Sequence, residues 1–383
     1  MSSFKLIENS KMMIVKDVLR KSLLSIGIIL ISGCGGSGES AAAETLLELS
    51  VTEIEIPYTG GVQTVSVEAG SEWTAYSDAD WILCNINGSA EKNGTIDIVV
   101  DENKDFEART ADVTVKSGTT RKGISIVQEA APELDSSDIT VPEGYRLVWQ
   151  DEFNDSNLDS PDESLWYYET GDNGWGNNEI QNYIAGTKNG VTCAEVSNGI
   201  FSIIAQKVGE EVYSIRINSK ESWKYGYFEA RLKLPKGKGT WPAFWMLPKE
   251  FKAWPDDGEI DIMEEVGYNP EYVSSSIHTK AYNHSIGTQK TKEVLIEGSQ
   301  SDFHVYALEW TENYIRTFVD GKELFYYPND KKGNKDTWPF NAPFYLKLNL
   351  AWGGFWGGAQ GVDESCLPAT YQIDYVRVFQ KNN

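Results

Sequence analysis

Short runs of alternating apolar and polar residues fill most of the chain, and they predict strands. Between residues 46 and 130, such runs occur at 62–67, 95–100 and 111–115, with Gly, Asn and Asp residues between them. Successive side chains of a strand point to opposite faces, so this alternation is typical of half-buried strands joined by turns. The pattern predicts a small antiparallel β-sandwich of the immunoglobulin type.

Residues 144–383 show the same alternation over a longer stretch. Clear examples are 223–234, 303–310 and 371–378, and no long segment has the periodicity of a helix. A region of this size made of strands predicts a β-jelly-roll sandwich, whose concave sheet commonly forms a ligand cleft. The polar segment 131–143 contains prolines and predicts a linker. We therefore expect an all-β protein of two domains.

The start of the chain, residues 1–33, has the features of a lipoprotein signal peptide. Basic residues precede an apolar run from Leu23 to Ile31, which is too short to span a bilayer. Small residues then lead to Cys34, and this junction resembles a bacterial lipobox, in which the cysteine is lipidated. An ordinary signal peptide is the alternative. Residues 34–45 are then a tether. We expect a bacterial lipoprotein at the outer membrane or cell surface, with the periplasmic face as the alternative.

Composition narrows the choice of partner. The net charge of −23 repels nucleic-acid phosphates and anionic lipids, and it favours a neutral polymer as substrate. The 13 Trp and 19 Tyr suit β-sandwich cores and also stacking on sugars. Cys84, Cys193 and Cys366 match no metal-binding spacing, so we interpret them as buried thiols, with a Cys193–Cys366 disulfide as the alternative. We expect a monomer that binds no nucleic acid.

Acidic residues crowd together in the segment 258–266. In a strand Glu259 and Asp261 share one face, and the segment contains no cation to offset their repulsion. The polar face of an ordinary strand is the alternative, but the crowding points to function. Hydrolysis of a glycosidic bond uses a carboxylate nucleophile, here Glu259, and a carboxylic acid. Strict alternation selects Glu265 as that acid, whereas a β-bulge selects Glu264.

The segment from Glu259 to Glu264 resembles the signature Glu-x-Asp-x-x-Glu of glycoside hydrolase family 16 in its bulged form. Further family landmarks follow in order within 144–381, at 149–153, 175–183, 225–231, 241–248, 276–279 and 374–378. The resemblance implies a jelly roll and a retaining mechanism, with Glu259 as nucleophile, Asp261 as assisting aspartate and Glu264 as acid/base. The laminarinase branch, which cuts β-1,3- or mixed β-1,3/1,4-glucans, is the most similar.

The family resemblance also implies residues that hold the sugar. They are Asn178, Arg216, Trp241, Trp245, His278 and Trp356. A purely structural role is the alternative for each. The loop around Trp356 has more aromatic residues than the commoner loop of the family, which leaves the linkage preference open.

The chemistry requires no cofactor. The resemblance implies a structural calcium ion, with Glu152 and Asp374 as side-chain ligands and the carbonyl of Gly199 as a third ligand. Surface carboxylates without a metal are the alternative. A family 16 enzyme acting on another neutral galactan or on xyloglucan, and a non-catalytic surface glycan-binding protein, are the alternatives to a β-glucanase.

The domain at 46–130 resembles the BACON module, an immunoglobulin-like domain found ahead of enzymes. The matching features are the turn at 58–61, the Trp73 and Trp81 pair, and the closing strand at 124–128. Glycan binding and a spacer role both stay open for this domain.

Overall fold

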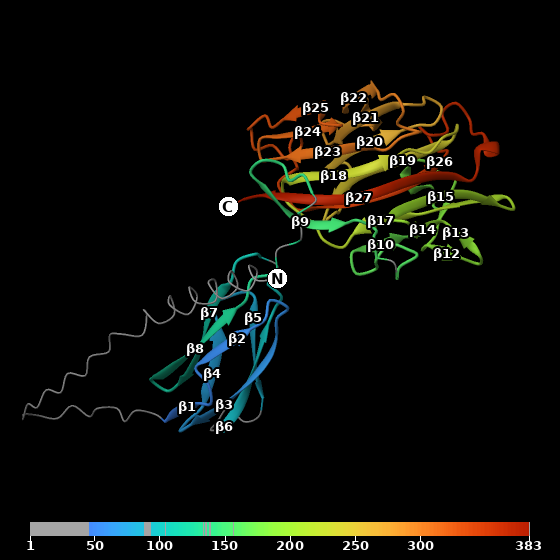
Figure 1. Ribbon diagram of the computed structural model, residues 1–383. Coiled ribbons are helices and arrows are strands. Elements are labelled where there is room, and N and C mark those ends of the chain that lie inside the picture. The colour runs from blue at the N-terminus through green and yellow to red at the C-terminus, as the bar shows by residue number, and fades with distance from the viewer. Residues whose placement is uncertain are drawn as a thin grey trace, which may run out of the picture. The chain divides into compact units, whose positions relative to one another are not determined.

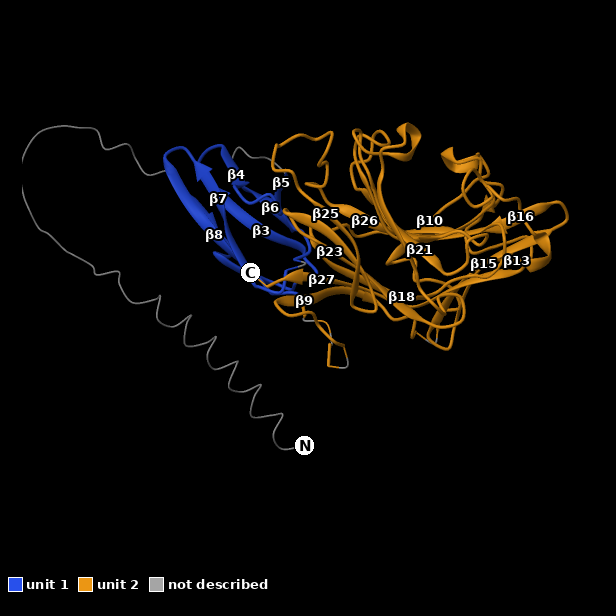
Figure 2. Cartoon of the chain, turned by 90° about the horizontal axis from the view of Figure 1, so that it is seen from above, with its two compact units in different colours: residues 1–131 blue, residues 132–383 orange. Residues whose placement is uncertain are grey.

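The computed structural model describes residues 46–87, 93–103, 105–132, 134, 136–137, 139–155 and 157–382. The predicted signal peptide, Cys34 and the tether lie outside these residues. The chain forms two compact units, which divide between Ala131 and Pro132 (Figures 1 and 2). Within the described part, no helix has the length and apolar character needed to cross a membrane.

Unit 1 consists of two four-stranded sheets. The first has the order β1 (Leu47–Leu49), β3 (Gly61–Ala69), β6 (Asn93–Val100) and β5 (Ile82–Asn87). The second has the order β2 (Glu53–Ile56), β8 (Thr120–Gln128), β7 (Arg109–Ser117) and β4 (Trp73–Ser77). In the second halves of β7 and β8 every second residue is buried, and Val113, Val115, Ile124 and Ile126 belong to a core that also contains Trp73. The predicted immunoglobulin-like sandwich is confirmed.

Unit 2 consists mainly of two large sheets. The seven-stranded sheet has the order β10 (Trp166–Glu169), β17 (Arg216–Ser219), β26 (Phe344–Trp352), β19 (Thr240–Pro248), β20 (Glu259–Glu265), β21 (Tyr272–His278) and β22 (Lys290–Leu295). The ten-stranded sheet has the order β11 (Asn182–Tyr183), β16 (Glu211–Ser214), β15 (Ile200–Val208), β27 (Ala369–Lys381), β18 (Gly226–Lys233), β23 (His304–Trp310), β24 (Tyr314–Val319) and β25 (Lys322–Pro328). In this second sheet β14 (Ala194–Ser197) also pairs with β15, and β9 (Tyr145–Asp151) with β27.

The two large sheets pack face to face, and Figure 2 shows β26 and β10 in one layer with β18 and β27 in the other. Apolar side chains of both sheets fill the space between them, for example Phe228 of β18 and Phe244 of β19, both fully buried. This arrangement confirms the predicted jelly roll. The seven-stranded sheet therefore has one face in the core and one face free to carry polar side chains.

The three cysteines of the described chain are free thiols, so the alternative disulfide between Cys193 and Cys366 does not form. Cys193 is buried, as expected. Cys84 and Cys366 are only half-buried, so the prediction of a buried thiol holds for one of the three.

Candidate active site

A β-bulge interrupts the catalytic strand β20. In the pairing with β21, Asp261 lies opposite Ser276 and Glu264 lies opposite Ser274, so three steps along β20 match two along β21. The extra residue lets two consecutive side chains, Ile262 and Met263, both enter the core. Glu264 consequently returns to the face that carries Asp261, and the bulge expected from the signature is confirmed.

Glu265, which strict alternation would have selected, points away from this face. Its carboxyl group is buried and accepts hydrogen bonds from Ser299 Oγ at 3.0 Å and Gln300 Nε2 at 2.5 Å. Burial raises the pKa of Glu265 to about 7. Its contacts are thus those of a structural residue.

Two adjoining hollows meet at the paired glutamates. Both hollows are lined by Glu259, Glu264 and Trp241. One, of about 530 Å³, extends along β21 and β22 and includes His278 and Trp356. The other, of about 460 Å³, extends across β17 and β26 and is lined by Glu169, Trp175, Arg216, Trp245, Tyr345 and Asn349. A long ligand lying in both hollows would present an internal bond to the two glutamates.

Burial raises the pKa values of the three acids in the cleft, and repulsion adds to the shifts of Glu259 and Glu264. Burial, followed by the charge of Asp261, raises the pKa of Glu259 to about 7, although His278, a hydrogen bond from Trp254 and Arg216 oppose the shift. Burial raises the pKa of Asp261 to about 8. Burial, and then Asp261, raises the pKa of Glu264 well above its usual range. The order fits an ionised nucleophile beside a protonated acid at neutral pH.

Neighbouring side chains hold the acids in place. Trp241 Nε1 donates to Glu264 Oε1 at 3.0 Å. His278 Nε2 lies 3.4 Å from Asp261 Oδ2 and 3.8 Å from Glu259 Oε1. His278 thus sits between the nucleophile and the assisting aspartate, where it can lower the pKa of Glu259.

The wall of the second hollow is a network of charges and aromatic rings. Arg216 Nε donates to Glu169 Oε2 at 2.5 Å, and its guanidinium lies 4.6 Å from the ring centroid of Trp175 and 4.8 Å from that of Trp245. Trp245 Nε1 donates to Asn349 Oδ1 at 2.7 Å. These contacts fix the two indoles that face the hollow.

The structure brings most of the predicted sugar-binding residues to the cleft. Arg216, Trp241, Trp245, His278 and Trp356 all line it, and the Trp356 ring packs edge-to-face on Trp241 with centroids 5.4 Å apart. Asn178 differs from the prediction. It is exposed, with a left-handed φ of 53°, and its neighbour Asn177 lines both hollows instead. The chain turns tightly here, with positive φ at Trp175 and Asn178, and this turn brings Asn177 to the hollows.

Several cleft residues were not predicted. They are Glu169, Trp175, Trp254, His284, Lys347, Asn349 and Phe355. Trp254 lies in a turn and His284 begins a short 3-10 helix, and their rings lie 4.7 Å apart by centroid. Neither residue belongs to an alternating strand, so no periodic pattern in the sequence could have found these two. Phe355 is 68% exposed at the rim of the first hollow.

The predicted calcium ligands do not fit a calcium ion. Both carboxylate oxygens of Glu152 accept hydrogen bonds from Arg377, at 2.7 and 2.9 Å. Asp374 Oδ2 accepts from Arg231 NH1 at 2.5 Å. Arginines therefore neutralise the two side chains that were expected to bind the metal. Gly199 is placed in a turn with φ 74°, and neither carboxylate needs a cation to offset its charge.

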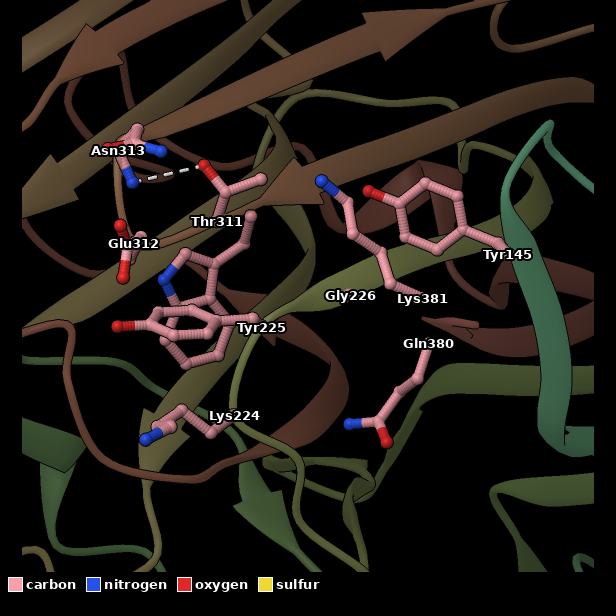
Figure 3. A pocket seen from close by; sticks show the side chains of 10 residues that line it. Tyr145, Lys224, Tyr225, Gly226, Thr311, Glu312, Asn313, Gln380 and Lys381 are labelled. Atoms are coloured by element: carbon pink, nitrogen blue, oxygen red, sulfur yellow. Dashed lines mark hydrogen bonds between the residues drawn. The ribbon is translucent and has the colours of Figure 1, made fainter. Parts of the chain in front are cut away.

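A separate pocket of about 460 Å³ lies at the ends of β9, β18, β23 and β27 (Figure 3). Tyr145, Lys224, Tyr225 and Lys381 line it, and Glu312 is the one acid among its lining residues. With a single carboxyl group it cannot perform two-carboxylate chemistry. The paired acids of β20 remain the candidate for catalysis.

A jelly-roll sandwich with paired carboxyl groups on the free face of one sheet defines a glycoside hydrolase. Residues 181–377 match the family model of glycosyl hydrolases family 16. The chain belongs to glycoside hydrolase family 16. Residues 71–129 match the BACON domain, which is described as an N-terminal domain with a proposed binding role.

Several family members are similar to unit 2. A β-glucanase of Rhodothermus marinus is 46% identical over 249 residues, which cover 62% of this chain and 85% of that protein. Glucan endo-1,3-β-glucosidase A1 of Niallia circulans is 39% identical over 62% of this chain and 38% of that longer protein. A solved structure of an SCLam variant, a non-specific endo-β-1,3(4)-glucanase with a bound β-glucan oligosaccharide, has 42% identity, covers 63% of this chain and 97% of that one, and gives a TM-score of 0.59.

Proposed function

We propose that the protein is a retaining endo-β-glucanase that hydrolyses β-1,3-glucan, mixed-linkage β-1,3/1,4-glucan or both. The carrying observation is the bulge that places Glu264 on the face of Glu259, at the junction of two hollows. Because the hollows extend to both sides of the acids, the cleft suits an internal bond. The names of the relatives, which are β-glucanases, and the sugar bound to SCLam support the substrate class.

The reaction follows from the two protonation states. The carboxylate of Glu259 attacks the anomeric carbon while Glu264 donates its proton to the glycosidic oxygen, which breaks the bond and leaves a glycosyl ester on Glu259. Glu264, now ionised, removes a proton from water. That water attacks the same carbon, releases Glu259 as a carboxylate and restores the proton on Glu264. Burial raises the pKa of Asp261, so this side chain can share a proton with the neighbouring acids and limit the charge beside Glu259.

A non-catalytic glycan-binding protein is the main competing function. Binding sugars does not require three crowded carboxyl groups in one strand, whose mutual repulsion costs free energy. The test is Glu259→Gln, with release of reducing sugar and glucan affinity measured on the same samples. We expect hydrolysis to be lost and binding to persist. Unchanged hydrolysis would reject the assignment of Glu259.

The choice among substrates needs a separate assay. Product profiles on laminarin, mixed-linkage glucan, xyloglucan and agarose would separate the proposed activity from the galactan and xyloglucan alternatives. We expect oligosaccharides from the first two substrates only. Cleavage confined to xyloglucan or agarose would reject the β-glucanase proposal while leaving the family assignment intact.

We also propose that the protein is a monomer anchored by lipid on Cys34 at the outer membrane or cell surface. The support is the apolar run followed by small residues and a cysteine in the sequence. Incorporation of labelled palmitate into the wild-type chain, and its loss in Cys34→Ser, would test the anchor. Label in both proteins would place the lipid elsewhere. Unit 1 is then either a glycan-binding domain or a spacer, and affinity electrophoresis of unit 1 against glucans would distinguish the two.

A further inference from the structure

Lys347 is a lysine with no role in the chemistry, yet it lies at the cleft. It belongs to β26, where Tyr345, Lys347 and Asn349 alternate with the core residues Leu346 and Leu348. Tyr345 and Asn349 line the second hollow, so Lys347 faces the same side from behind them. Its side chain is 0% exposed. A fully buried ammonium group is costly to place unless it is well paired.

The contacts of Lys347 connect the charged and aromatic parts of the hollow. Its Nζ donates to Glu169 Oε2 at 2.8 Å and to Asn218 Oδ1. The same Nζ lies 5.0 Å from the ring centroids of both Trp245 and Tyr345. Each ring lines the hollow. The ammonium group therefore lies behind the two rings and supports the surface on which a sugar would stack.

Glu169 extends this support to a second cation. The same Oε2 atom accepts from Lys347 and from Arg216, which itself lies 4.8 Å from Trp245. One carboxylate thus holds two cations, and both cations lie within 5.0 Å of the Trp245 ring centroid. Sugar-binding sites need their aromatic platforms fixed by such a supporting layer, because a mobile ring loses binding energy on ordering.

We propose that Lys347 is a positioning residue for substrate binding, which fixes Trp245 and Tyr345 as the sugar-stacking wall of the second hollow. This inference rests on the proposed glucanase function. An apolar residue would fill the same space without the cost of burying a charge. It would not, however, attract the faces of the two aromatic rings, as the ammonium group of Lys347 does. The proposed role is in substrate binding, because Lys347 contacts neither the glycosidic bond that breaks nor the acid/base Glu264.

The protonation of Lys347 makes this support depend on pH. Burial and then Arg216 lower the pKa of Lys347 to about 7, against the opposing effects of Glu169 and Glu259. Among the groups around it, Glu169 of β10 stays ionised because Arg216 and Lys347 outweigh its burial, and the pKa of Tyr345 is raised, so it stays neutral. Trp245 of β19 and Asn218 of β17 do not titrate. The ammonium is therefore present below about pH 7 and is lost as the pH rises.

The test measures binding without turnover. In the Glu259→Gln background, which removes turnover and the charge of Glu259 that acts on Lys347, calorimetry with laminari-oligosaccharides would give the Kd between pH 5.5 and 8.5. We expect the Kd to rise by roughly tenfold at high pH. Adding Lys347→Met should raise the Kd at pH 5.5 by about the same factor and remove the tenfold rise that Lys347 causes. Asp261 and Glu264 are present in both proteins, so the difference between the two pH profiles gives the contribution of Lys347.

Controls separate this role from a general loss of structure. Leu346→Val changes the core face of the same strand, and we expect it to lower the Tm while leaving the Kd and its pH dependence unchanged. In the otherwise wild-type enzyme, Lys347→Met should raise KM with kcat nearly unchanged. A Kd that does not vary with pH in the Glu259→Gln protein would overturn the proposal, even if Lys347→Met failed to fold. Absence of glucan binding at every pH would instead reject the proposed substrate class, and this inference with it.

Discussion

The bulge in β20 makes a sharp prediction about two adjacent glutamates. Glu264→Gln should remove the general acid while keeping an acceptor for the indole N–H of Trp241. Glu265→Gln changes the next residue, which has the same chemistry and a raised pKa, but which accepts from Ser299 and Gln300 away from the cleft. The two substitutions are isosteric, so they differ only in the direction in which the side chain points.

The two substitutions should affect different properties: Glu264→Gln should lower activity, and Glu265→Gln should lower stability. General acid catalysis contributes about 10² to 10⁴-fold, and we expect Glu264→Gln to lower kcat/KM on glucan by a factor in that range. Glu265→Gln replaces a buried acceptor by a group with an amide donor opposite Gln300. It should cost about 1–3 kcal/mol of stability and little activity at a temperature where the protein is folded.

A substrate with a good leaving group sharpens the assay. An aryl β-glycoside whose phenol is acidic needs little protonation to depart, so we expect Glu264→Gln to lose much less activity on it than on glucan. Glu265→Gln should change kcat/KM by the same small factor on both substrates. The measurements are kcat/KM on laminarin and on the aryl glycoside, with Tm from thermal unfolding. Loss of glucan hydrolysis in Glu265→Gln, with Glu264→Gln active, would refute the assignment of the acid and the interpretation of the bulge.

Further predictions concern pH, packing and domain independence. The kcat/KM profile should fall as the pH drops through about 7, because Glu259 then gains a proton and loses its nucleophilicity. Trp241→Phe removes a hydrogen bond that lowers the pKa of Glu264, so the alkaline limb of the profile should move to higher pH. Ile262→Ala leaves a cavity at a buried site and should cost about 2–5 kcal/mol in urea unfolding, whereas an exposed substitution such as Val62→Ala should cost little. Residues 132–383 alone should hydrolyse soluble glucan like the full chain, since SCLam matches this unit over nearly its whole length; a large loss would assign unit 1 a part in catalysis.

The sequence predicted the fold class well because strand alternation is a local signal. The runs at 111–115 and 223–234 alternate because one face of each strand is in a core, and both are strands in the structure. The alternation alone could not locate the bulge, since one extra residue changes the pattern without leaving a separate mark. The family signature supplied that information.

The remaining differences arise at residues that only the family resemblance supplied, where a local turn or a distant partner decides what the side chain contacts. Asn178 lies in a turn whose positive φ values redirect its side chain, and alternation does not apply there. Glu152 and Asp374 were expected to bind calcium, but Arg377 and Arg231 neutralise them from other positions. Lys347 is different, because its position between Tyr345 and Asn349 in an alternating strand could have placed it on the cleft face.

Because of the extra residue in β20, odd-numbered residues face the cleft before the bulge, as in Glu259 and Asp261, and an even-numbered residue, Glu264, faces it after the bulge. A one-residue deletion between Asp261 and Glu264 would remove the bulge and restore regular pairing, and Glu264, then two positions after Asp261, would stay on the cleft face. Regular pairing at the present length would instead turn Glu264 into the core and Glu265 into the cleft. A substitution of Ile262 or Met263 by another apolar residue would keep the bulge and the direction of the side chain of Glu264. The extra residue and the bulge therefore depend on each other, and a library that explores new specificities can change the apolar side chains here or remove one residue, but a segment of the present length must keep the bulge.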